Sequence, residues 1–191
     1  MPELADLPWP VQTARLTLRP TVAADFPAIW EIRRREDVSL WMTDLSADFD
    51  AFAAKLAEPA RLAVTLTVLL DGTVIGDVML RPEDPYAQGE VAEQAKGAGA
   101  EIGWCIDPAY GGQGYATEAA AELVRIAFED LGMHRLVALC FADNEPSWRL
   151  MERLGMRREA HGVKDSLHRD RGWVDGLTYA LLAEEWAGRA G

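Results

Sequence analysis

Residues 110–117, near the middle of the chain, carry the strongest chemical signal in the sequence. They read Tyr-Gly-Gly-Gln-Gly-Tyr-Ala-Thr, between an apolar strand-like run at 101–106 and an amphipathic helical pattern at 116–130. Three glycines within four positions let the backbone approach a ligand closely. The N–H groups at a helix start lack partners inside the helix, and the helix dipole adds partial positive charge there. The pattern therefore predicts a phosphate-binding site at 112–117, with a simple tight turn as the alternative.

Other patterns that could bind phosphate or a metal fit the sequence less well. Thr117 stands where a dinucleotide-binding loop has its third glycine or alanine, and no Gly-Lys-Ser/Thr of a P-loop follows. The three histidines are scattered, so no metal site is expected. Cys105 and Cys140 lie in apolar runs and are typical of buried thiols in a cytosolic protein, with a catalytic Cys–His pair as the weaker alternative.

The chain of 191 residues is acidic, with 31 acids, 19 bases and a net charge of −12. This balance argues against a nucleic-acid partner, which needs a basic surface. It favours a cationic partner such as an amine, although acidity also serves solubility alone. No apolar run reaches the ~20 residues that span a bilayer, and the N-terminus lacks a signal-peptide pattern, so we expect a cytoplasmic protein away from membranes.

The pattern around the glycine loop predicts one α/β domain over residues 1–191, with a mixed sheet of about seven strands and flanking helices. Expected strands are 15–20, 62–70, 73–80, 101–106, 136–141, 156–163 and 172–182. Expected helices are 21–35, capped by Thr21, then 48–56, 116–130 and 144–155, capped by Asn144. Asp71-Gly72 suits a two-residue hairpin turn, and the strand–helix–strand unit at 101–141 requires a parallel crossover. Residues 82–99 read as an exposed insertion with a brief helix at 91–96.

Several motifs, taken together and in order, resemble the GNAT acetyltransferases. They lie at 101–108, 112–119, 144–147 and 154–156. The segments at 15–20 and from 172 to Trp186 are similar to the RimJ/RimL-like branch of that family. The resemblance implies a fold with one splayed parallel strand pair, and transfer of an acetyl group from acetyl-CoA to an amine.

The resemblance also implies where acetyl-CoA binds. Its pyrophosphate would lie on the loop amides, and its pantetheine arm would run between the strands that contain Ile106 and Leu139. The Ile106 N–H would polarise the thioester carbonyl. Asn144 matches a pantetheine contact, alongside its expected role as a helix cap. The implied cofactor-binding residues are Ile106, Gly112, Gln113, Gly114, Tyr115, Ala116, Thr117 and Asn144.

Two residues are candidates for acid–base catalysis. Glu101 matches an acid found in many relatives and would act as the base on the amine through water; the alternative is an exposed charge at a strand edge. Ser147 stands where RimL-like proteins place serine and would protonate the CoA thiolate; the alternative is a polar residue of the first helical turn. Gly111 replaces a common Gln or Arg, and Met151 replaces a common Tyr, so one phosphate contact and a tyrosine acid are missing.

Trp30, Trp41 and Met42 lie where relatives line the acceptor pocket, with core packing the stronger alternative for Trp30. The acceptor implied is a protein N-terminal α-amine or a small cationic amine. A non-catalytic acyl-CoA-binding regulator remains the alternative function, and a nucleotide-binding oxidoreductase is a weaker third. The sequence leaves the oligomeric state open, a homodimer included.

Overall fold

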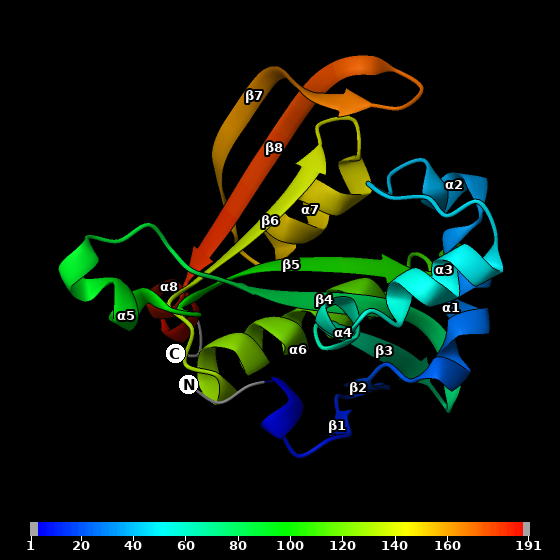
Figure 1. Ribbon diagram of the computed structural model, residues 1–191, viewed down its shortest axis with the longest axis horizontal. Coiled ribbons are helices and arrows are strands. Elements are labelled where there is room, and N and C mark those ends of the chain that lie inside the picture. The colour runs from blue at the N-terminus through cyan, green and yellow to red at the C-terminus, as the bar shows by residue number, and fades with distance from the viewer. Residues whose placement is uncertain (1–3, 189–191) are drawn as a thin grey trace.

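A mostly antiparallel sheet of eight strands forms the centre of the computed structural model, which describes residues 4–188. The strands lie in the order β1-β2-β3-β4-β5-β6-β8-β7, and within this range only β5 and β6 run parallel to each other (Figure 1). The strands are β1 (Val11–Gln12), β2 (Leu16–Pro20), β3 (Thr65–Leu70), β4 (Thr73–Glu83), β5 (Gly99–Ile106), β6 (Arg135–Phe141), β7 (Arg157–His168) and β8 (Gly172–Leu182). The helices are α1 (Phe26–Arg33), α2 (Glu36–Ser39), α3 (Phe49–Leu56), α4 (Pro59–Leu62), α5 (Ala92–Ala95), α6 (Tyr115–Arg125), α7 (Glu145–Arg153) and α8 (Ala183–Ala187).

The predicted mixed α/β sheet is confirmed, with eight strands in place of about seven. The additional strand is β1, which is only two residues long and pairs with β2. A strand this short leaves no alternating pattern to read in the sequence. The predicted hairpin is confirmed as well, because Asp71 and Gly72 adopt φ values of 48° and 80°, as the two-residue turn between β3 and β4 requires.

Two local predictions near the N-terminus are wrong. The strand expected from residue 62 begins at Thr65, because α4 occupies the preceding residues with a proline at its start, a position where proline needs no N–H partner. Thr21 does not cap a helix. Its hydroxyl lies 2.9 Å from the Thr67 hydroxyl in the sheet, and α1 begins only at Phe26, after a short 3-10 turn.

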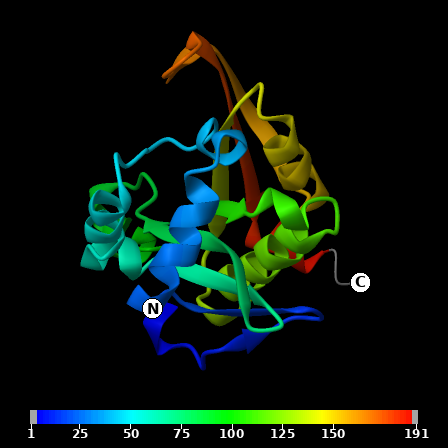
Figure 2. The ribbon, with the colours of Figure 1, turned by 90° about the vertical axis from the view of Figure 1, so that its right-hand side faces the viewer.

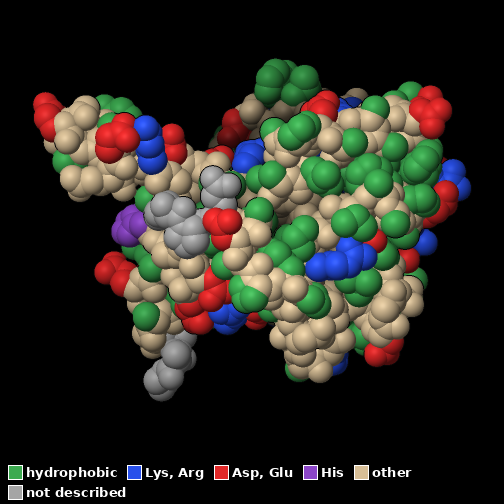
Figure 3. All heavy atoms as spheres, turned by 60° about the horizontal axis from the view of Figure 1, so that its bottom comes forward, with side chains coloured by type: hydrophobic (Ala, Val, Ile, Leu, Met, Phe, Trp, Pro, Cys, Tyr) green, Lys and Arg blue, Asp and Glu red, His purple; other side chains and the backbone are tan. Residues whose placement is uncertain are grey.

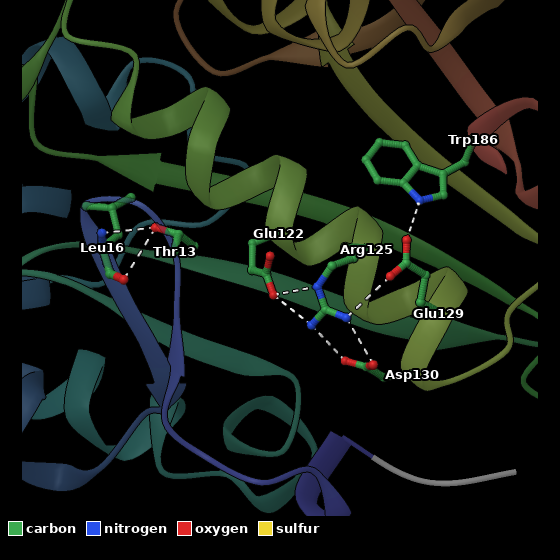
Figure 4. Close-up of polar contacts among 7 residues, drawn as sticks. All are labelled: Thr13, Leu16, Glu122, Arg125, Glu129, Asp130 and Trp186. Atoms are coloured by element: carbon green, nitrogen blue, oxygen red, sulfur yellow. Dashed lines mark hydrogen bonds and ion pairs between the residues drawn. The ribbon is translucent and has the colours of Figure 1, made fainter. Parts of the chain in front are cut away.

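Helix α6 packs against β5, β4 and β2 and supplies the crossover between the two parallel strands. Its buried stripe consists of Ala119, Ala120, Leu123 and Val124. At its far end Arg125 donates to Glu122 and to Asp130, across the π-helical turn Ile126–Asp130 (Figure 4). Glu129 accepts a hydrogen bond of 3.1 Å from Trp186 Nε1 of α8. These contacts fix the C-terminal end of α6, so the glycine loop at its other end projects from a rigid support.

The helices α1 and α3 form a second, smaller core next to β4. Phe26, Ile29, Phe52 and Leu56 are buried together there. The guanidinium of Arg33 binds the carboxylate of Asp77 on β4, and this aspartate is only 2% exposed. Because α2 follows directly after α1, this anchor also places α2 and the loop after it near the end of β5.

Two segments extend away from the rest of the fold. The hairpin of β7 and β8 projects beyond α7 (Figure 2). Residues 84–98 form an arm between β4 and β5, which contains α5 and carries both acidic and basic side chains (the lobe at the upper left of Figure 3). The prediction of an exposed insertion is confirmed, since Tyr86 within it is fully exposed. A hydrogen bond of 2.8 Å from Gly97 N to Asp84 Oδ1 closes the base of the arm.

Candidate active site

The parallel strands β5 and β6 pair over a short distance and then diverge. They are paired at only three positions, the last of which joins Glu101 to Val137. Beyond it, β5 stays paired with β4 as far as Ile106, while β6 stays paired with β8 as far as Phe141. The strands therefore separate in a V, which is visible in Figure 1. A cavity of about 1290 Å³ lies at this opening, and the apolar side chain of Leu139 is 55% exposed within it.

The glycine loop forms the wall of this cavity at the start of α6. Gly112 and Gly114 adopt φ values of 73° and 82°, which residues with a Cβ rarely adopt. The first backbone hydrogen bond of the helix runs from Glu118 N to Gly114 O, at 3.0 Å. The N–H groups that precede it have no partner inside the helix, and the helix dipole makes this end electropositive. The loop can therefore donate several hydrogen bonds to an anion.

A brace from the N-terminal part of the chain holds the loop in this shape. Arg15 donates to the backbone oxygen of Gln113 at 2.8 Å and to Glu118 at 2.7 Å, and its guanidinium stacks 4.4 Å from the Tyr115 ring centre. Thr13 donates a further bond of 2.6 Å to Glu118. Burial alone would raise the pKa of Glu118, but these hydrogen bonds outweigh it and hold that pKa below its ordinary value. No local sequence pattern predicts the brace, because Arg15 and Glu118 are 103 residues apart.

A cation also lies at this end of the cavity. Arg153 of α7 lines the wall, and its Nε donates a hydrogen bond of 3.3 Å to the hydroxyl of Thr117 in the first turn of α6. Sequence reasoning missed this residue, because an arginine near the end of a helix is ordinarily a solvated charge. Here it adds positive charge beside the helix start.

The cavity brings together most of the residues that the sequence singled out. Those in its wall are Trp41, Met42, Glu101, Ile106, Gly112, Gly114, Tyr115, Ala116, Thr117, Asn144 and Ser147. Gln113 is not among the wall residues and contacts Arg15 through its backbone oxygen. Trp30 also lies outside this wall. It packs against Phe52, with ring centres 5.3 Å apart, and lines a separate pocket between α1 and α3.

Glu101 lies at the apex of the V, where the paired part of β5 and β6 ends. It faces Arg81 across the β4–β5 ladder, and the two side chains form an ion pair. Burial raises the pKa of Glu101 and is the largest influence on it. Arg81 acts in the opposite direction, and the negative charge of Glu83 adds to the increase, so the pKa stays above its ordinary value. A carboxyl group of this kind is a stronger base than a free glutamate.

Ser147 and Asn144 lie across the gap, at the start of α7. Ser147 lies close to Cys140 on β6, and its hydroxyl acts to lower the pKa of that thiol. Burial has the larger effect and raises the pKa of Cys140 to about 11, so the thiol stays protonated at neutral pH. Asn144 occupies the N-cap position of α7, but its side chain makes no cap hydrogen bond, contrary to the sequence prediction. Its carboxamide lines the cavity and keeps its hydrogen-bonding capacity for a ligand.

The opposite end of the cavity is formed by the loop after α2 and by the β7–β8 hairpin. Arg169 of the hairpin donates to the backbone oxygens of Ser39 and Met42. His168 is 2% exposed, lies edge-on to Trp41, and contacts Leu40 O through Nε2 at 2.9 Å. We refer to these contacts of Arg169 and His168 as the clasp. They hold Trp41 and Met42 in the wall.

Nδ1 of His168 accepts a hydrogen bond of 3.1 Å from Asp170 N. Because Nδ1 is an acceptor, Nε2 must carry the hydrogen that is donated to Leu40 O.

Within residues 4–188, no group of three or more His, Cys, Asp or Glu side chains is arranged to hold a metal ion. None of the helices described is long and apolar enough to cross a membrane.

Comparison with known proteins places this architecture. The sequence profile of the acetyltransferase (GNAT) domain matches residues 15–157. An uncharacterised N-acetyltransferase of Bacillus subtilis, YnaD, is 42% identical over 86 residues, which are 45% of this chain and 50% of the relative. A GNAT-family acetyltransferase structure from Bacillus anthracis superposes with a TM-score of 0.77 at 29% identity, covering 92% of this chain and 99% of the other.

The RimJ structure from Mycobacterium smegmatis, in complex with CoA-disulfide, has a TM-score of 0.71 at 25% identity and covers 89% and 83% of the two chains. The chain matches about half the length of the curated relative YnaD. The matched profile nevertheless covers most of the chain, from β2 to the start of β7, and includes the glycine loop, the V-shaped opening and α7. The chain belongs to the GNAT acetyltransferase family and resembles its RimJ-like members.

Proposed function

We propose that this protein transfers an acetyl group from acetyl-CoA to a primary amine by direct attack within a ternary complex. The observation that carries the proposal is one continuous cavity with two different ends. It joins the hydrogen-bond donors of the glycine loop to the carboxylate of Glu101, through the opening between β5 and β6. Family membership supports the use of acetyl-CoA.

The wall residues fit a long thioester with a phosphate group at one end. The loop amides of 112–117, with Arg153 beside them, would hold the pyrophosphate. Leu139 and the open strand edges would line the pantetheine arm, with the Asn144 carboxamide as a polar contact. The N–H of Ile106, at the end of β5, would donate to the thioester carbonyl and stabilise the negative charge that develops there. Bound acetyl-CoA supplies the activated acetyl group.

Glu101 would remove the proton from the attacking amine through a water molecule. The amine must be neutral to attack. Deprotonation at pH 7 costs ~1 kcal/mol for an α-amine with a pKa near ~8, and ~4–5 kcal/mol for a lysine near ~10.4. A carboxylate with a raised pKa is sufficient for the first of these. Arg81 would hold the carboxylate of Glu101 in place by their ion pair.

Ser147 would donate its hydroxyl proton to the thiolate that leaves. It lies in the cavity wall at the start of α7. The side chain at position 151 cannot take this role, because Met151 has no exchangeable proton and is 1% exposed. Cys140 lies close to Ser147, and its thiol stays protonated at neutral pH.

The acceptor in this proposal is a protein N-terminal α-amine or a small cationic amine. Both carry positive charge in solution, and the acidic chain would attract either of them. The homology to RimJ-like proteins and the accessible acceptor end are compatible with both.

Incubation with acetyl-CoA and a panel of amines tests the proposal, with free CoA release and the mass gain of the acceptor as readouts. Release of CoA that matches acetylation of at least one amine is expected. A parallel calorimetric titration with CoA separates binding from turnover. Binding of CoA without acetylation of any amine would favour an acyl-CoA-binding regulator, which the missing phosphate contact at Gly111 and the missing tyrosine at Met151 also suggest.

A further inference from the structure

The charged residues of the cavity wall are strongly unbalanced. Within residues 4–188 the wall contains the carboxylates of Asp37, Glu101, Asp107, Glu118 and Asp165, and one cationic side chain. That cation is Arg153, which lies beside the glycine loop. In the rest of the wall, including the acceptor end, every charged side chain is acidic. That part of the wall attracts cations and repels anions.

Four of the five wall carboxylates already have a cation of the protein as partner. Glu118 binds Arg15, and Glu101 binds Arg81. Asp37 and Asp107 share the guanidinium of Arg35. It lies 3.1 Å from the carboxylate of Asp37 and 3.8 Å from that of Asp107. Asp165 differs from all of these, because no cationic side chain of the described chain lies within ion-pair distance of it. Its carboxylate is exposed to solvent in the cavity wall, so its negative charge is available to a ligand.

The β7–β8 hairpin is shaped to seat this carboxylate. Asp165 lies in an irregularity of the ladder between Gly162 and Ser166. Gly162 and Gly176 face each other across the strands, and the carboxylate occupies the space above both. A Cβ on Gly176 would lie 2.7 Å from Asp165 Oδ1, and one on Gly162 would overlap the carboxylate. Ser166 donates to Oδ1 at 2.9 Å, which leaves Oδ2 available.

The chemistry of acetyl transfer indicates which positive charge of the acceptor Asp165 could bind. The nitrogen that attacks the thioester must be neutral, and an unpaired carboxylate beside it would favour its charged form. Asp165 is therefore suited to a group that stays cationic. Trp41, an aromatic side chain of the wall that could also attract a cation, already has the Arg171 guanidinium 5.0 Å from its ring centre.

We propose that Asp165 binds a second positive charge of the acceptor, so that the enzyme selects amines that carry another ammonium or guanidinium group. This inference rests on the proposed acetyl transfer. It defines the acceptor by its chemistry, which a diamine or a peptide with a basic side chain near its N-terminus can provide.

The variant Asp165→Asn tests this, because it removes the charge and keeps the shape. We expect KM for butanediamine to rise roughly tenfold, and KM for butylamine to stay within about twofold of the wild type. The same comparison with two tripeptides, one with lysine and one with norleucine in second position, distinguishes the two sources of the second charge. Added salt should reduce the preference for the dication in the wild type and have little effect on the variant.

The matched control is Glu159→Gln, which removes a carboxylate charge from the same hairpin but outside the cavity wall. It should leave both KM values unchanged. Equal losses with mono- and dications in Asp165→Asn, or no loss with either, would overturn the proposal. Calorimetric binding of both amines to the CoA complex is measured alongside. If no amine is acetylated, the proposed function fails, while the binding preference still decides the role of Asp165.

Discussion

At the α6 end of the cavity the wall is mainly backbone, whereas at the α2 end it is mainly side chains. The glycine loop and the first turn of α6 are consecutive in sequence, and their donors are peptide N–H groups. The acceptor end joins the loop after α2 to the β7–β8 hairpin, through contacts such as that of His168 with Leu40, which lie 128 residues apart. A cofactor that is the same for every member of a family can be bound by backbone. An acceptor that differs between members has to be recognised by side chains.

Glu101 lies where the two ends meet, and its loss should have the largest effect. We expect Glu101→Gln to reduce kcat/KM for amines roughly 100- to 1000-fold at neutral pH, with CoA affinity unchanged. The wild type should lose activity as the pH falls through the raised pKa of Glu101, because only the ionised form accepts a proton. The variant should lack this acidic limb. Unchanged kcat/KM between about pH 6 and 9 would exclude Glu101 as the base.

Glu83→Gln is the matched control for this substitution. Glu83 also contacts Arg81 and raises the pKa of Glu101 through its negative charge. Its removal should lower that pKa and move the acidic limb to lower pH, while the maximal rate stays within about threefold. A loss of rate as large as that of Glu101→Gln would mean that local charge, rather than proton transfer, is responsible.

The backbone end is tested by the double variant Gly112→Ala with Gly114→Ala. A Cβ at positive φ costs roughly 1–2 kcal/mol for each residue, so for the two residues together we expect CoA affinity to fall about 30- to 900-fold in calorimetric titration. Gly172→Ala provides the control, because its φ of 68° carries similar strain outside the cavity wall. Equal CoA affinity in all three proteins would argue against the loop as the phosphate site.

The side-chain end is tested by His168→Ala, with the exposed His161→Ala as control. Loss of the clasp should release Trp41 and Met42 and raise KM for the acceptor roughly fivefold, while CoA affinity changes less than about twofold. If CoA affinity and acceptor KM change together, the two ends are not independent and the comparison fails. A thermal melt of each variant shows whether the fold is retained.

The smallest effect is expected at Glu159, which lies outside the cavity wall. Hydrogen bonds from Arg135 are the main cause that lowers its pKa to about 2, and Arg157 adds to them. A depressed folded-state pKa adds stability above the ordinary glutamate pKa, and this contribution is lost as the pH falls toward about 2. Because the group is partly exposed, Glu159→Gln should cost less than ~1 kcal/mol in chemical denaturation at pH 7. The difference should disappear in acid, and kinetic constants should not change.

Local patterns were sufficient to predict the sheet, the Asp71-Gly72 hairpin and the loop before α6, because each is determined by neighbouring residues. Position 144 illustrates a partial success, since Asn144 stands at the start of α7 but makes no cap bond. The brace of Arg15 and the clasp of His168 could not be predicted, because they depend on tertiary pairing of distant segments. The residue type alone does not distinguish Trp30 from Trp41. Only the packing of α1 against α3 shows that Trp30 lies outside the cavity wall, whereas Trp41 lies in it.

The short pairing between β5 and β6 affects where the sheet should unfold locally. Five strands on one side and three on the other share only three paired positions. Amide protons at this junction should exchange faster than those in the ladders on either side, as expected for separate cooperative units. A molecule bound between β5 and β6 would contact both blocks of strands and stabilise the folded state. The melting temperature should then rise with its concentration, by an amount set by its dissociation constant.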